Sequence, residues 1–149
     1  MLRDAQWVLS DAQAVTTAAA TASTNVYDTL GPAPADIGKG EIMWLVCSVN
    51  TTVTATGSAT VTFAVQTDDN ESFSSATTLF TSAAIGKATL VAGYRVFAIR
   101  LPVGCERYIR ALITPAVDDL LTGKFDIYLT PNVDLLPSTP HPRATYSVA

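Results

Sequence analysis

The sequence predicts an all-β protein, a two-sheet antiparallel β-sandwich of about eight short strands with extended N- and C-terminal arms. Three observations lead to this fold class. Apolar and polar side chains alternate in several short segments, most clearly in 58–69, where Val61, Phe63 and Val65 share one face. Thr and Val are frequent in these segments, and β-branched side chains fit a pleated strand better than a helix. Polar turns end the segments, as at Asp68, so one sheet face must be buried against another sheet.

The length of 149 residues favours one compact domain, predicted here as 1–130 and followed by a Pro-rich extended tail, 131–149. Charged residues make up 15% of the chain, against about 25% in typical domains. Either partners or further copies cover much of the surface, or Ala and Thr simply replace charge there. The net charge of −4 argues against nucleic acid as a partner. We expect no signal peptide and no membrane segment, since no apolar stretch approaches about 20 residues.

The N-terminal third is predicted to hold two weak strands. Residues 2–9 form either a short strand or an arm, and Trp7 is expected to dock on its own core rather than on another subunit. Residues 14–24 are rich in Ala, but their threonines argue against a helix. Residues 24–30 alternate loosely and are predicted to be a strand, followed by a Gly- and Pro-containing loop over 31–41.

The next predicted strand, Ile42 to Val49, is apolar on both faces, as expected for the middle of a sandwich. The polar connection 50–57 suits a hairpin leading into the strand that begins at Ser58. Residues 69–75 are predicted to be turn and loop. Two short apolar stretches, 77–81 and 88–91, then follow on either side of Gly86.

A second hairpin is predicted from 94–101 and 106–113, which are separated by four residues that include Pro102 and Gly104. Their inward-facing residues are expected to be Phe97, Ile99 and Leu101, and Ile109, Ala111 and Ile113. The basic residues beside these strands are interpreted as solvated or paired rim residues rather than a functional cluster; they are Arg95, Arg107 and Arg110.

The last predicted strand is 123–130, in which Phe125, Ile127 and Leu129 alternate with polar residues. The tail contains Pro131, Pro137, Pro140 and Pro142 and can be neither a central strand nor a helix. It either runs extended over a surface or is disordered. The first alternative is favoured by its apolar residues Leu135, Leu136 and Tyr146.

No set of side chains in the sequence predicts an active site, a cofactor site or a metal site, so we expect a protein that is not an enzyme. His141 stands between two prolines, a poor position for a preorganised catalytic group. Cys47 is expected to be a buried apolar residue, and free thiols are favoured over a disulfide with Cys105. Residues 68–71 could hold calcium, but a strand-ending turn is the favoured interpretation, and Asp118-Asp119 is interpreted as a solvated loop pair.

Several short stretches form a set that is similar to a known family: 11–14, 44–46, 64–70, 73–79, 90–95, 106–108 and 121–123. Together they resemble the capsid cement, or decoration, proteins of tailed bacteriophages, specifically a jelly-roll type of short-tailed phages. The resemblance covers about residues 2 to 130. It implies a jelly-roll sandwich that binds the outer surface of an icosahedral capsid, as a symmetric oligomer, and clamps neighbouring major capsid proteins.

The expected function is therefore that of a virion structural protein, made in the host cytoplasm and located on the capsid exterior. Its expected partners are the major capsid protein and further copies of itself, as a dimer or a trimer. The alternative is a carbohydrate-binding sandwich for host adsorption, which needs exposed aromatic residues on a platform. Candidate contacts with the partner or with other copies are Leu2, Arg3, Trp7, Leu135, Leu136, Arg143 and Tyr146.

Overall fold

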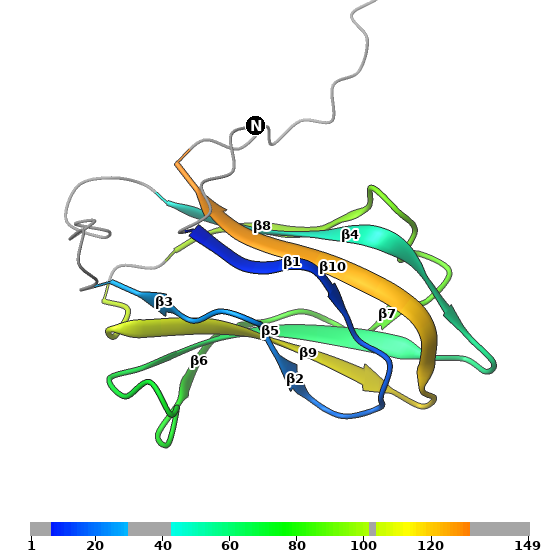
Figure 1. The fold of residues 1–149 in the computed structure, drawn as a ribbon, viewed down its shortest axis with the longest axis horizontal. Coiled ribbons are helices and arrows are strands. Elements are labelled where there is room, and N and C mark those ends of the chain that lie inside the picture. Colours follow the sequence, from blue (N-terminus) through cyan, green and yellow to red (C-terminus); the bar gives the residue numbers. More distant parts are fainter. Residues whose placement is uncertain (1–6, 30–42, 102–103, 132–149) are drawn as a thin grey trace, which may run out of the picture.

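The computed structural model describes residues 7–29, 43–101 and 104–131, and these form two antiparallel sheets that pack face to face (Figure 1). No α-helix occurs in these residues. Sheet A has the strand order β1-β10-β4-β8, formed by β1 (Val8–Ala14), β10 (Leu120–Thr130), β4 (Trp44–Ala55) and β8 (Arg95–Arg100). The predicted all-β sandwich is therefore confirmed.

Sheet B is built around two long neighbouring strands, β9 (Tyr108–Ala116) and β5 (Thr60–Asp68). Two short strands, β2 (Thr21–Ala22) and β3 (Tyr27–Asp28), both pair with the outer edge of β9. On the far side, β6 (Thr77–Thr81) and β7 (Ile85–Gly86) both pair with β5. Each outer position of sheet B is thus shared by two short strands.

Strand β5 has the alternation that its sequence predicts. Val61, Phe63 and Val65 are almost fully buried, whereas the residues between them are half-exposed. Across the core, β10 contributes Phe125, Ile127 and Leu129, all fully buried. These residues belong to one main core that fills the space between the two sheets, because the apolar face of each sheet can leave water only against the other.

Strand β4 is longer than predicted and is buried on both faces. Leu45, Val46 and Cys47 are successive residues, so they point to alternate faces, and all three are at most 1% exposed. The predicted hairpin over 50–57 is wrong: β4 continues to Ala55 in sheet A, and β5 lies in sheet B. The turn between them passes closely by another loop, since a Cβ added at Gly57 would clash with the carboxylate of Asp118.

The predicted hairpin between 94–101 and 106–113 is also wrong. Strand β8 pairs with β4 in sheet A, and β9 pairs with β5 in sheet B, so the two strands lie in opposite sheets instead of being neighbours in one. The predicted inward faces are nevertheless correct: the buried residues are Phe97, Ile109, Ala111 and Ile113, and Ile99 and Leu101 are partly buried and pack against the main core. Two strands that bury their apolar faces show the same alternation whether they are neighbours in one sheet or lie in opposite sheets across the core. The alternation therefore could not distinguish a hairpin from a crossing between the sheets.

The weak N-terminal predictions shift in position. Within the described residues the first strand begins at Val8, and the Ala-rich stretch 14–24 is not helical. Only Tyr27 and Asp28 of the predicted strand 24–30 form a ladder. Residues 69–75 are turn and loop, as predicted, and 88–91 forms turns from which only Leu90 is buried. The predicted loop 31–41 lies outside the described residues, as do 1–6 and all but Pro131 of the tail.

Candidate interaction surfaces

The acidic turn after β5 is structural. The Asp68 carboxylate accepts hydrogen bonds from Asn70 N at 2.9 Å and from Ser75 N at 2.8 Å. Burial by itself would raise the pKa of Asp68, but these bonds outweigh that effect and hold the pKa below its ordinary value. No group of three or more His, Cys, Asp or Glu placed to hold a metal ion occurs among the described residues. The hydrogen bonds of Asp68 support the interpretation of 68–71 as a strand-ending turn.

The second acidic pair also tethers a loop. Asp119 accepts a hydrogen bond from Ala18 N at 2.6 Å, and Leu120 N donates to Thr16 O at 2.9 Å. These contacts join the β9–β10 turn to the chain that leaves β1. Asp119 is exposed, as expected for a loop residue, and its carboxylate is bound by the backbone of Ala18.

Both cysteines are free. Cys47 is fully buried in the main core, and burial raises the pKa of its thiol, with a further contribution from Asp126. Cys105 is half-buried, and burial raises its pKa as well. A thiol with a raised pKa is a poor nucleophile because the thiolate is the reactive form. The expectation of free thiols is confirmed.

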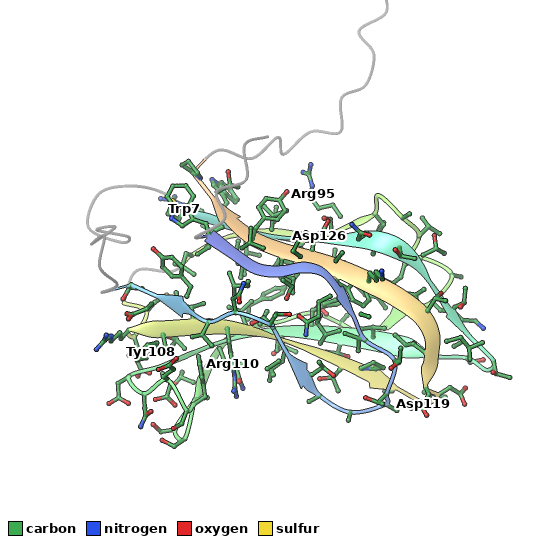
Figure 2. All side chains as sticks on the ribbon, viewed as in Figure 1. Trp7, Arg95, Tyr108, Arg110, Asp119 and Asp126 are labelled. Carbon is green, nitrogen blue, oxygen red and sulfur yellow. The ribbon has the colours of Figure 1, made fainter. Side chains whose placement is uncertain are left out.

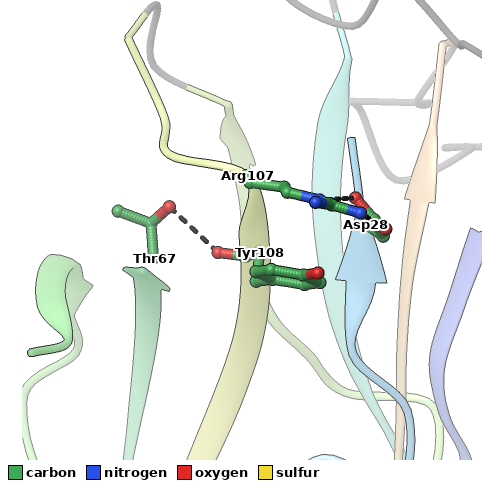
Figure 3. Close-up of polar contacts among 4 residues, drawn as sticks. All are labelled: Asp28, Thr67, Arg107 and Tyr108. Carbon is green, nitrogen blue, oxygen red and sulfur yellow. Dashed lines mark hydrogen bonds and ion pairs between the residues drawn. The ribbon is translucent and has the colours of Figure 1, made fainter. Parts of the chain in front are cut away.

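Arg107 and Arg110, at and beside the start of β9, bind different partners. Arg107 binds Asp28 through two contacts of 2.9 Å, and its guanidinium carbon lies 4.9 Å from the centre of the Tyr108 ring (Figure 3). This ion pair ties β3 to the start of β9. The pairing agrees with the rim interpretation, and the exposed position of Arg107 makes it a weak source of stability.

Arg110 lies within β9, three residues after Arg107, and has different partners. Its Nε and Nη2 atoms both donate to Gln66 Oε1, at 3.0 and 2.8 Å, and its guanidinium lies 4.1 Å from the centre of the Phe73 ring. These contacts hold the 69–76 loop against sheet B. Arg107 and Arg110 therefore do not form one functional cluster.

The outer face of sheet A carries a row of apolar side chains that crosses all four strands. Val8 pairs with Tyr128, Tyr128 with Val46, and Val46 with Ala98. These residues, together with Trp44, pack as a second apolar cluster, separate from the main core. We call them the outer apolar row. A sheet face that met only water would be expected to carry polar residues here.

A buried carboxylate lies beside the outer apolar row. Asp126 of β10 (Figure 2) is 4% exposed. It accepts hydrogen bonds from Ala12 N at 2.7 Å and from Asn50 Nδ2 at 3.2 Å. Ala12 has a φ of 46° at a shift of register in β1, where the ladder leaves its N–H without a strand partner. Asp126 thus secures the bulge that keeps β1 on sheet A.

Of the residues predicted to contact a partner or another copy, only Trp7 lies in the described part of the chain. It is half-buried and packs against the main core. The remaining six lie outside the described residues: Leu2, Arg3, Leu135, Leu136, Arg143 and Tyr146. Sequence reasoning missed the outer apolar row as a surface. The available signal was the run Ile42 to Val49, whose residues are apolar on both faces.

The fold and these contacts define a two-sheet antiparallel β-sandwich whose clustered polar side chains tie strands and loops together. The family model named Bbp16 matches residues 9–129, which is most of the 149-residue chain. The chain therefore belongs to the Bbp16 family. No curated protein matches it. Within the part of the chain that the structure describes, there is no helix long and apolar enough to span a bilayer.

Proposed function

We propose that this chain is a non-enzymatic virion protein that binds the outer surface of an icosahedral capsid and stabilises it by bridging major capsid protein subunits. The observation that carries the proposal is the outer apolar row on sheet A. Val46 and Tyr128 lie on the face away from the main core and are covered by their neighbours, whereas Val8, Trp44 and Ala98 of the same row are half-exposed and form its accessible part. A sandwich that works alone in water has little reason to make this face apolar.

The low charge of the chain supports the same proposal. Charged residues are 15% of the sequence, and the central parts of protein interfaces are depleted in charge. A specific contact needs roughly 800 Å² of buried surface on each partner. Many such contacts repeated around a shell act together, so each individual contact can be weak.

The strand order supports a jelly roll, the fold that the resemblance to cement proteins implies. Along the chain, β1 lies in sheet A, β2 and β3 in sheet B, β4 in sheet A, and β5 to β7 in sheet B. The last three strands then alternate between the sheets. A chain that repeatedly crosses between two sheets, with each outer position of sheet B counted as one strand, is the pattern of an eight-stranded jelly roll.

The direct test is co-sedimentation of the purified chain with empty capsids built from the major capsid protein. We expect saturable binding and an increase in the temperature at which the capsids disassemble. A glycan array on the same preparation tests the alternative, a carbohydrate-binding module. Hits on the array together with no co-sedimentation would reject the capsid proposal.

Two Lys variants test whether the outer face of sheet A or that of sheet B binds the capsid. Ala98→Lys places a charge on the outer apolar row, at the edge strand of sheet A. Thr62→Lys places the same charge on the outer face of sheet B, opposite Thr114. We expect Ala98→Lys to weaken capsid binding by about tenfold or more, because a buried unpaired charge is costly, and Thr62→Lys to leave it unchanged. The reverse order would move the capsid contact to sheet B.

A further inference from the structure

Strand β8 contains a β-bulge that changes the direction of its first side chain. The pairing with β4 passes from Phe97 directly to Arg95, so Val96 is the extra residue. Val96 and Phe97 both pack in or against the main core, although neighbouring residues of a regular strand point to opposite faces. Arg95 and Arg100 are five residues apart, a spacing that places two side chains on opposite faces of a regular strand. The bulge brings these two arginines to the same face.

This shared face is the outer face of sheet A. Arg100 pairs with Trp44 and Arg95 pairs with Ser48, and residues paired across two strands lie on the same face. Trp44 belongs to the outer apolar row, and Ser48, four residues further along β4, shares its face. Figure 2 shows Arg95 on the side of sheet A that points away from sheet B. Ala98 of the outer apolar row lies between the two arginines.

The outer face of sheet A is therefore basic as well as apolar. Strands β4, β8 and β10 contain three basic residues, Arg95, Arg100 and Lys124, and one acidic residue, Asp126. The Asp126 carboxylate is buried and accepts the hydrogen bonds described above, whereas Arg100 and Lys124 are exposed. Strand β1 adds one acidic residue, Asp11, at the opposite edge of the sheet from β8. A chain with a net charge of −4 thus presents positive charge on this face.

Most acidic side chains of the described residues gather elsewhere. They lie in sheet B, in the loops beside its strands and in the β9–β10 turn: Asp28, Asp68, Asp69, Glu71, Glu106, Asp118 and Asp119. The basic residues among them are fewer: Lys87, Arg107 and Arg110. The outer face of sheet A is therefore positive relative to the sheet B side. Such a distribution of charge draws a negatively charged partner toward sheet A during encounter.

We propose that the outer face of sheet A binds an acidic surface of the capsid protein, in which carboxylates face Arg95 and Arg100 and an apolar side chain covers Ala98 between them. This inference rests on the proposed function for the identity of the partner and specifies the chemistry of the contact. With the bulged residue set aside, the two arginines are four strand positions apart, which is about 13 Å at roughly 3.3 Å per residue. Two carboxylates with a similar separation on the partner match both arginines.

Carboxylates fit these arginines better than the phosphates of a nucleic acid. The planar guanidinium binds a carboxylate through two parallel hydrogen bonds. The exposed Arg100 side chain has no hydrogen bond or ion pair with another described residue, so it can bind a partner without breaking a contact within this part of the chain. Phosphate binding depends on many clustered basic residues, and this chain has a net charge of −4 and apolar side chains between its two arginines.

Co-sedimentation of variants with empty capsids tests the proposal. Arg100→Gln removes the charge and the paired hydrogen bonds, and we expect it to raise the dissociation constant by about tenfold or more. Arg100→Lys keeps the charge but loses the planar donor pair, so it should weaken binding less. The matched control is Thr62→Glu, which makes the same change in net charge on the outer face of sheet B and should leave binding unchanged. Urea denaturation checks that each variant is as stably folded as the wild type.

The sign of a charge at position 98 and the salt concentration provide two further readouts. Ala98→Glu should weaken binding more than Ala98→Lys, because it repels carboxylates and neutralises the neighbouring arginines. Wild-type binding should weaken as salt rises from about 0.1 M to about 1 M, since the Debye length falls from about 10 Å to about 3 Å. Arg100→Gln should lose less of its remaining binding over the same range.

Three results would overturn this proposal while the chain still binds capsids: equal binding by Arg100→Gln and the wild type, a greater loss in Ala98→Lys than in Ala98→Glu, or binding that does not weaken with salt. Binding of duplex DNA at about 0.1 M salt that depends on Arg100 would also overturn it, since the anion would then be a nucleic acid. A wild-type chain that does not co-sediment with capsids would overturn the proposed function itself, and the carboxylate contact with it. The failure of this proposal alone is thus distinguishable from the failure of both.

Discussion

Phe63 of β5 and Phe125 of β10 meet edge to face across the core, with ring centres 5.2 Å apart and ring planes at 74°. Both side chains are at most 1% exposed, and each comes from a different sheet. The contact joins the central region of sheet A to that of sheet B. Residues 62 positions apart in the chain thus set the spacing of the two layers at this point.

We predict that this ring pair couples the two sheets energetically. Phe125→Ala should lower the free energy of unfolding by about 3–5 kcal/mol, since it leaves a cavity in a close-packed core. Phe63→Leu and Phe125→Leu should each cost less, and the double variant should reveal a coupling of about 0.5–1.5 kcal/mol. Urea denaturation of the wild type, the two single Leu variants and the double Leu variant measures this coupling. Strictly additive effects of the two Leu substitutions would contradict it.

The β9–β10 turn contains a strained residue whose replacement should stabilise the protein. Val117 has a φ of 76° and is 74% exposed, an unusual conformation for a β-branched side chain. Asn tolerates this conformation much better, so Val117→Asn should raise the free energy of unfolding by about 1 kcal/mol. Val91→Asn, at a residue 47% exposed, is the control for replacing an exposed valine. Equal effects of the two substitutions in chemical denaturation would remove strain as the cause.

The hydrogen-bonded Asp68 carboxylate should make stability depend on pH in the acid range. Its pKa is lowered in the folded state, so its stabilising effect is present above the unfolded pKa of about 3.9 and is lost as pH falls through the folded pKa. Asp68→Asn should melt several degrees below the wild type at pH 7, and the gap should close toward pH 2. Asp11→Asn, which removes an exposed carboxylate, controls for the loss of one charge. A gap that stayed constant with pH would refute this role.

The two cysteines should differ in reactivity toward a thiol reagent. In the folded protein, Cys105 should react slowly, and Cys47 should react only when the chain unfolds, because it is 0% exposed and its pKa is raised. Cys105→Ser should therefore abolish labelling of the native protein. Since neither residue forms a disulfide, a reducing agent should leave the melting temperature unchanged. A drop in melting temperature on reduction would show a disulfide in solution.

The Pro-rich tail is predicted to act in association rather than in folding. Deletion of 131–149 should weaken self-association or capsid binding and leave the sandwich folded. Urea denaturation and far-UV circular dichroism check the fold, and sedimentation with and without empty capsids checks the binding. Unchanged binding by the truncated chain would remove the tail from the mechanism.

Part of the candidate surface was accessible from the sequence. The run Ile42 to Val49 is apolar on both faces, and that pattern predicts burial of both faces of β4, as observed. In β10 the sequence pattern is misleading. Asp126 and Tyr128 alternate with apolar residues, as solvent-facing residues do, but they are only 4% and 5% exposed. Polar residues within an alternating pattern do not show whether a bonded partner, such as Ala12 N for Asp126, makes their burial tolerable.

The sequence by itself determined that the chain forms short strands, where most of them turn, and which side chains of β5 and β9 face inward. These properties depend on neighbouring residues, through alternation and turn chemistry. Only the tertiary structure decided that β4 and β5, and β8 and β9, lie in different sheets. Two strands can bury their apolar faces equally well as neighbours in one sheet or in opposite sheets across the core. Which strands pair is therefore settled by how the ten strands of the described residues pack together.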